Sequence, residues 1–153
     1  MIEFLVEANN FLYRFPDNII FRDTANGDMK LVEHRRGDFI YRNYIIGNRS
    51  LHGTILVLQN NKPIWILAYE GGVVDHLMSD DTVRKIYAFV RKNLYRATLE
   101  HPIRGPNEYH EGKLNYSNSF YGHPDKFNGS ETVTLEDQKI IYKLNYSGGD
   151  IIF

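Results

Sequence analysis

The chain has 153 residues, no cysteine and a formal net charge of −1. Its length suits one domain over 1–153, and its charge excludes a general electrostatic attraction to nucleic acid or to membranes. The lack of cysteine excludes a disulfide framework, and no apolar run approaches the length of a membrane span. Because Glu3 also stands where a signal peptide carries basic residues, we expect a cytoplasmic protein.

The first half of the chain predicts one helix followed by strands. Apolar side chains recur at helical spacing over residues 2–13, and a turn at 15–17 ends the pattern. Apolar alternation bounded by turn residues then predicts strands over 29–34, 38–46, 51–59 and 62–70. Asn60 and Asn61 tolerate the positive φ of a tight turn, so the last two strands should form a hairpin.

The second half repeats this order. Ser79 is suited to cap a helix over 79–96, with acidic residues in its first turn and an apolar stripe for the core. Arg104 follows in a loop over 102–106 that a glycine and a proline should fix. Further strands are predicted over 113–121, 130–135 and 139–147, with a short tail strand to residue 153.

Two stretches of the sequence share one pattern. Residues 59–74 resemble residues 137–152, and a constant offset of 77 residues places Tyr69 on Tyr146 and the first glycine pair on the second. Such self-similarity predicts an internal repeat. The alternative is coincidence, because any two strand–turn–strand units share apolar alternation and a glycine stop.

We therefore predict an α+β fold made of duplicated αβββ units, with halves over about 1–77 and 78–153. The strands should form one antiparallel sheet or a pair of facing sheets. The two main helices should cover one face.

Aromatic residues and arginines supply the candidate binding site. A two-fold repeat of strands leaves a groove between its halves, lined by the non-core face of the central strands. Tyrosine and tryptophan present flat faces for stacking, and arginine presents a planar fork that suits phosphate or carboxylate. The predicted ligand-binding residues are Arg42, Tyr44, Trp65, Tyr69, Arg104 and Tyr146. Together they suit a small anionic, nucleotide-like ligand, whereas the alternative is that the aromatics are ordinary core and the arginines are solvated.

The six histidines do not form a metal or paired catalytic motif. We therefore expect no metal and no cofactor. His52-Gly53-Thr54 fits the His-x-Thr element of two-histidine phosphoesterases, which need a second such element for acid and base. The repeat-related segment, Gly129-Ser130-Glu131, has no histidine, which argues against that class of enzyme.

The polar face of the second helix is basic. It carries Arg84, Lys85, Arg91, Lys92 and Arg96. A basic helix face can meet nucleic acid, but the net charge is near zero and no basic arm accompanies it. We interpret it as a solvated face and expect no nucleic-acid partner, while a homodimer is compatible with every hypothesis below.

Several segments together resemble a bacterial family of unknown function whose members occur alone and behind helix-turn-helix domains. The matching residues include FLVEAN at 4–9, GDFIYR at 37–42, NKPIW at 61–65, RGP at 104–106 and the end of the chain from 142 to 151. The resemblance implies a ligand-sensing module, by analogy with the GyrI-like effector domains of transcription regulators. A free-standing module of this kind implies sequestration, as in phage proteins that bind nucleotide immune signals.

The first hypothesis is thus a non-enzymatic protein that binds or sequesters a small anionic, nucleotide-like ligand, in phage anti-defence for example. The second is a phosphodiester hydrolase that uses His52. The third is a protein-binding inhibitor that uses a sheet edge or tyrosine hot spots.

Overall fold

The structure is a computed structural model that describes residues 1–14, 19–23 and 29–153. The predicted turn at 15–17 lies outside the described residues. The helices are α1 (Ile2–Arg14) and α2 (Asp80–Leu94). The strands are β1 (Ile19–Asp23), β2 (Met29–Arg36), β3 (Phe39–Ile46), β4 (Ser50–Gln59), β5 (Lys62–Val73), β6 (Glu108–Glu111), β7 (Leu114–His123), β8 (Lys126–Leu135) and β9 (Ile140–Asp150). Within these ranges, neither helix combines the length and the apolar character needed to cross a membrane.

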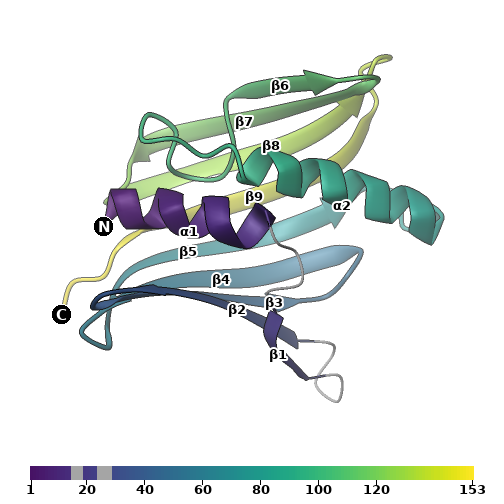
Figure 1. Ribbon diagram of the computed structural model, residues 1–153. Coiled ribbons are helices and arrows are strands. Elements are labelled where there is room, and N and C mark those ends of the chain that lie inside the picture. Colours follow the sequence, from purple (N-terminus) through teal and green to yellow (C-terminus); the bar gives the residue numbers. More distant parts are fainter. Residues whose placement is uncertain (15–18, 24–28) are drawn as a thin grey trace.

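All nine strands form one antiparallel sheet, in the order β1-β2-β3-β4-β5-β9-β8-β7-β6. Both helices lie on the same face of this sheet (Figure 1). The α+β class, the antiparallel sheet and the position of the helices on one face are therefore confirmed. The layer of side chains between the helices and the sheet is the core.

The strand count of each half differs from the prediction. In the described residues, the first half contributes five strands and the second contributes four, whereas an αβββ unit has three. The four segments predicted in the first half correspond to β2 to β5, so β1 was missed. β6 was not predicted because Glu108–Glu111 is short and polar, and a four-residue edge strand has no apolar alternation to detect. The predicted tail strand is wrong, since β9 runs unbroken to Asp150 and residues 151–153 are not in a strand.

The local signals that fixed α2 and the central hairpin are confirmed. The Ser79 side chain accepts a hydrogen bond from the backbone N–H of Thr82 at 3.2 Å, which caps α2. Asn60 and Asn61 have φ of 50° and 62° in the turn between β4 and β5. The buried residues of α2 are Val83, Ile86, Phe89, Val90, Asn93 and Leu94. Tyr87, next to Ile86 in this helix, is only half-buried.

The glycine pairs lie inside β5 and β9 and do not end the sheet. Gly71 pairs with Leu144, and Gly148 pairs with Leu67. A Cβ at Gly71 would lie 2.5 Å from the Cα of Leu144, and one at Gly148 would lie 2.9 Å from the Cα of Leu67. Only glycine permits such an approach, so these residues allow β5 and β9 to join the two halves of the chain.

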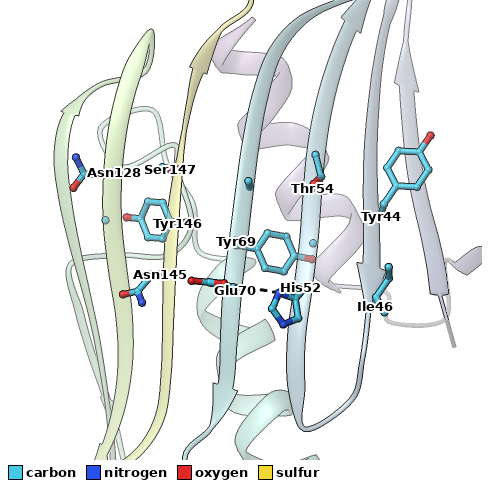
Figure 2. A pocket seen from close by; sticks show the side chains of 13 residues that line it. Tyr44, Ile46, His52, Thr54, Tyr69, Glu70, Asn128, Asn145, Tyr146 and Ser147 are labelled. Carbon is cyan, nitrogen blue, oxygen red and sulfur yellow. Dashed lines mark ion pairs between the residues drawn. The ribbon is translucent and has the colours of Figure 1, made fainter. Parts of the chain in front are cut away.

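Tyr69 and Tyr146 lie opposite each other at the centre of the sheet. Their rings point in opposite directions, each across the next strand (Figure 2). A glycine leaves room for each ring, Gly53 in β4 for Tyr69 and Gly129 in β8 for Tyr146. The contacts on the two sides of the centre therefore match, while the duplication of a whole unit stays a prediction.

The loop 102–106 is anchored in the core through Arg104. Its guanidinium donates a hydrogen bond of 2.6 Å to the fully buried carboxylate of Glu131. Tyr116 donates to the other oxygen of that carboxylate at 2.5 Å and accepts from the backbone N–H of Gly105. Burial alone lowers the pKa of Arg104, but the Glu131 carboxylate outweighs it and raises that pKa well above its ordinary value. The ion pair thus holds a charged arginine inside the fold.

The substitution Gly53→Ala tests the packing of Tyr69. The added methyl group would lie 2.1 Å from a ring carbon of Tyr69. Because overpacking a core costs about 1–3 kcal/mol, we expect a loss of about 3 kcal/mol in the free energy of unfolding, measured with urea. The control is Gly37→Ala, whose Cβ meets nothing within 4 Å and whose φ of 58° makes a loss of about 1 kcal/mol the expected result. Equal losses in the two variants would contradict this account.

The substitution Glu131→Gln tests the buried ion pair. It leaves the buried charge of Arg104 without a counter-ion, so we expect a loss of about 3 kcal/mol in urea unfolding. The double variant Arg104→Met with Glu131→Gln should lose less than Glu131→Gln alone, because it removes that charge.

The exposed pair of Lys85 and Asp81, 2.6 Å apart, supplies the control for this experiment. Lys85→Met should change the stability little, because solvent already screens the two charges. A loss in Glu131→Gln no larger than that in Lys85→Met would show that the buried pair does not hold the loop.

Candidate ligand-binding site

A cavity of about 780 Å³ lies between the helices and the sheet. Residues of α1, α2, β2 to β5, β9 and the loop 102–106 line it, and we call it the helix-side cavity. Its aliphatic lining consists of Leu12, Val32, Ile45, Leu51, Val83, Val90, Leu94 and Leu144. Small-molecule sites typically have volumes of about 300–1,000 Å³ and mostly apolar walls, so this cavity has the size and character of such a site.

Arg91 is a cation on this lining without a carboxylate partner in the described part of the chain. It lies one helical turn after Tyr87, at the edge of the apolar stripe of α2. Its side chain is half-buried, and burial lowers the pKa of the guanidinium below its ordinary value. A partly desolvated cation of this kind favours the approach of an anion.

Two other arginines on the lining already have acidic partners. Arg49 donates to the carbonyl of Met78 at 2.7 Å and to the carboxylate of Asp80 at 2.5 Å, which ties β4 to the start of α2. Arg84 lies 3.6 Å from Asp81 on the same helix, but Asp81 also pairs with Lys85 at 2.6 Å, and the Arg84 side chain is mostly exposed. A carboxylate therefore compensates the charge of Arg49, and solvent screens the charge of Arg84.

Tyr69, Asn43 and Arg104 form the floor of the cavity. The Tyr69 hydroxyl donates to the side-chain oxygen of Asn43 at 2.9 Å, and the Asn43 amide donates to the hydroxyl of Tyr13 at 3.4 Å. The guanidinium of Arg104 lies 5.2 Å from the centre of the Tyr69 ring, within range of a cation–π contact. Its buried Nε has no hydrogen-bond partner among the described residues, so the floor retains one donor.

A second hollow, of about 690 Å³, lies on the face of the sheet that the helices leave bare (Figure 2). Along β5 its lining consists of the exposed Ala68 and Glu70 and the buried Tyr69 between them. His52 lies beside Glu70, with 3.9 Å between their nearest side-chain nitrogen and oxygen. This open hollow combines exposed polar side chains with tyrosines, glycines and aliphatic residues, and it encloses a ligand less than the helix-side cavity does.

The hydrolase hypothesis places its histidine in the open hollow. The register of the sheet sets Gly53 opposite Tyr69 and Gly129 opposite Tyr146, so the structural counterpart of His52 is Asn128. The sequence alignment placed β4 one residue out of register on β8. In either register, the residue that corresponds to His52 is not a histidine. A two-histidine acid–base pair across the centre of the sheet is not formed by these positions.

The six predicted binding residues do not share one surface. Arg42 and Tyr44 lie on the bare face of β3, where Arg42 donates to Glu33 at 2.7 Å. Tyr44 lines the open hollow, whereas Arg104 lines the helix-side cavity. Tyr69 lies on the lining of both. A single small ligand cannot reach Arg42 and Arg104 together, because the sheet lies between them.

The predicted face is wrong for three aromatic residues. Trp65, Tyr69 and Tyr146 point toward the core and are at most 7 % exposed. Trp65 donates its indole N–H to the carbonyl of Pro124 at 2.7 Å and stacks on Phe127 at 5.4 Å, so protein atoms already surround it. Alternation gave the right period for these strands but did not tell which face the helices would cover.

The sequence interpretation missed Arg91 because it assigned the basic residues of α2 to one solvated face. Arg84, Lys85 and Lys92 are indeed exposed, but Arg91 is not. The spacing along the helix would have indicated its position. Arg91 lies four residues after Tyr87, on the same face of α2, and directly after the buried Val90.

The comparisons with known proteins give one match. A family model described as "Domain of unknown function (DUF5680)" matches residues 43–151. No curated protein and no solved structure matches the chain. The family model supports the resemblance to a family of unknown function, while bacterial origin and helix-turn-helix partners stay predictions. Because the model covers well over half of the sequence, the chain belongs to this family, DUF5680.

Proposed function

We propose that the protein binds a small organic anion in the helix-side cavity and releases it unchanged. The observation that carries this proposal is Arg91, a half-buried guanidinium without a carboxylate partner in the described residues, on the lining of a cavity of about 780 Å³. A carboxylate or phosphate can accept two parallel hydrogen bonds from a guanidinium. Partial burial strengthens this attraction relative to bulk water, and partial exposure limits the cost of desolvation.

Binding without reaction is favoured by the chemistry of the lining. The described lining contains no histidine, serine or glutamate, and its acid, Asp80, is mostly exposed and paired with Arg49. The tyrosine hydroxyls are poor bases or nucleophiles at neutral pH, since burial raises the pKa of Tyr87 to about 12 and raises that of Tyr69 further. We therefore prefer a binding protein to an enzyme.

A nucleotide is one class of ligand that this proposal includes. The rings of Tyr13, Tyr69, Tyr87 and Tyr142 on the lining support a flat ligand. Sequestration of such a ligand, including a role in phage anti-defence, depends only on the resemblance to effector domains. Sensing and sequestration both need a ligand that leaves the cavity unchanged.

Arg91→Met tests the anion site. Methionine preserves much of the side-chain bulk and removes the charge, so we expect the fold to persist and the affinity for a bound anion to fall at least tenfold, or about 1.4 kcal/mol. Native mass spectrometry of the protein as purified would identify any ligand that it retains. Calorimetric titration with adenosine monophosphate and with octanoate would then compare the variant with the wild type.

Lys92→Met is the matched control, because Lys92 is adjacent in sequence but exposed, and it pairs with Glu111 away from the cavity. Its affinities should equal those of the wild type. Equal binding by the Arg91 and Lys92 variants would remove Arg91 from the site. Recovery of a hydrolysed product, with loss of turnover in His52→Ala, would support the hydrolase instead.

A further inference from the structure

We infer that the ligand is an amphipathic monoanion, with one carboxylate at Arg91 and an unbranched apolar body along α2. This inference rests on the proposed function and names the class of ligand for the same cavity. Its evidence is the distribution of charge, apolar surface and free hydrogen-bonding groups along the lining.

The environments of the arginines on the lining support one anionic group. Arg49 is paired with Asp80 and Arg104 with Glu131, while Arg84 shares Asp81 with Lys85 and is mostly exposed to solvent. Arg91 lacks such a partner within the described ranges, so one ligand charge neutralises it. The further charges of a ligand with several phosphate groups would meet arginines that are already paired, as Arg49 and Arg104 are, or mostly exposed, as Arg84 is.

Two hydroxyl groups on the walls already have hydrogen-bond partners. The Tyr69 hydroxyl donates to Asn43, and the Tyr87 hydroxyl donates to the carbonyl of Arg49 at 3.0 Å. A sugar placed between these walls would bury hydroxyl groups with few partners, which is costly. An alkyl body avoids this cost, since it needs no hydrogen bonds.

The apolar wall along α2 sets the direction and the length of the ligand's alkyl chain. Val90, Tyr87 and Val83 lie on the lining between Arg91 and the N-terminal end of α2, and Arg84 beside Val83 is mostly exposed. At 1.5 Å per residue, the helix rises about 12 Å from Arg91 to Val83. Beyond Val83 the lining becomes polar, at the ion pair of Arg49 and Asp80. A chain that extends past this point would leave the apolar wall.

The test is calorimetric titration with straight-chain carboxylates from acetate to dodecanoate, each below its micelle concentration. Each added methylene that is buried should tighten binding roughly fourfold, until the chain outgrows the apolar wall of about 12 Å. Octanol, which lacks the charge, should bind at least tenfold more weakly than octanoate. Arg91→Met should remove that difference, and Arg91→Lys should retain part of it.

A second variant tests the wall itself. Leu51 is half-buried on the lining, opposite α2, and Leu51→Phe should shorten the chain length of tightest binding without weakening acetate. A merely structural role for Leu51 would weaken all chain lengths equally.

The outcomes separate this inference from the proposed function. Binding of adenosine monophosphate that depends on Arg91, with no binding of octanoate, would overturn the amphiphile and keep the anion site. Octanoate binding that is equal in Arg91→Met and Lys92→Met would overturn the role of Arg91 and indicate non-specific apolar contact. Failure of both probes to bind the wild type would overturn both proposals.

Discussion

The pairing of β5 with β9 is the interaction on which the rest of the structure depends. It joins two halves of the chain into one sheet, and glycines at the crossing allow the backbones and side chains to approach. Tyr69 and Tyr146 occupy the centre of this pairing and extend their rings in opposite directions. Because Tyr69 also forms part of the cavity floor, the same pairing that closes the sheet positions the candidate site.

The arginines of the chain differ in what surrounds them, and that difference decides which of them can serve a ligand. Arg104 is almost fully buried and already holds Glu131, so its charge stabilises the loop 102–106. Removing its partner would be costly, and a ligand would have to compete with a buried carboxylate. Arg91 is less buried and has no such partner among the described residues. Arg104, which the sequence analysis selected, therefore has a structural role. Arg91, which it did not select, is the candidate ligand contact.

Features governed by neighbouring residues could be predicted from the sequence. The cap of α2 at Ser79 and the turn at Asn60-Asn61 depend on local backbone chemistry, and both were found where predicted. The face of each strand that becomes buried depends on where the helices pack, which is a tertiary property. Trp65 and Arg42 illustrate this limit, since alternation placed both on strands but could not say that the sheet would separate them. The environment of Arg91 likewise depends on how α2 packs over the strands β2, β3, β4 and β5.

The boundary of the family match divides the lining of the cavity. Arg91, Tyr69 and Tyr87 lie within the matched residues 43–151, whereas Leu12 and Val32 lie before them. The candidate anion contact and most of the α2 wall thus belong to the matched region, and part of the opposite apolar wall comes from the N-terminal segment. Charge fixes the end of a ligand that binds Arg91, while apolar contact selects the shape of its body. The proposed anion contact thus depends on the matched region alone, whereas the shape of the apolar wall also depends on residues before it.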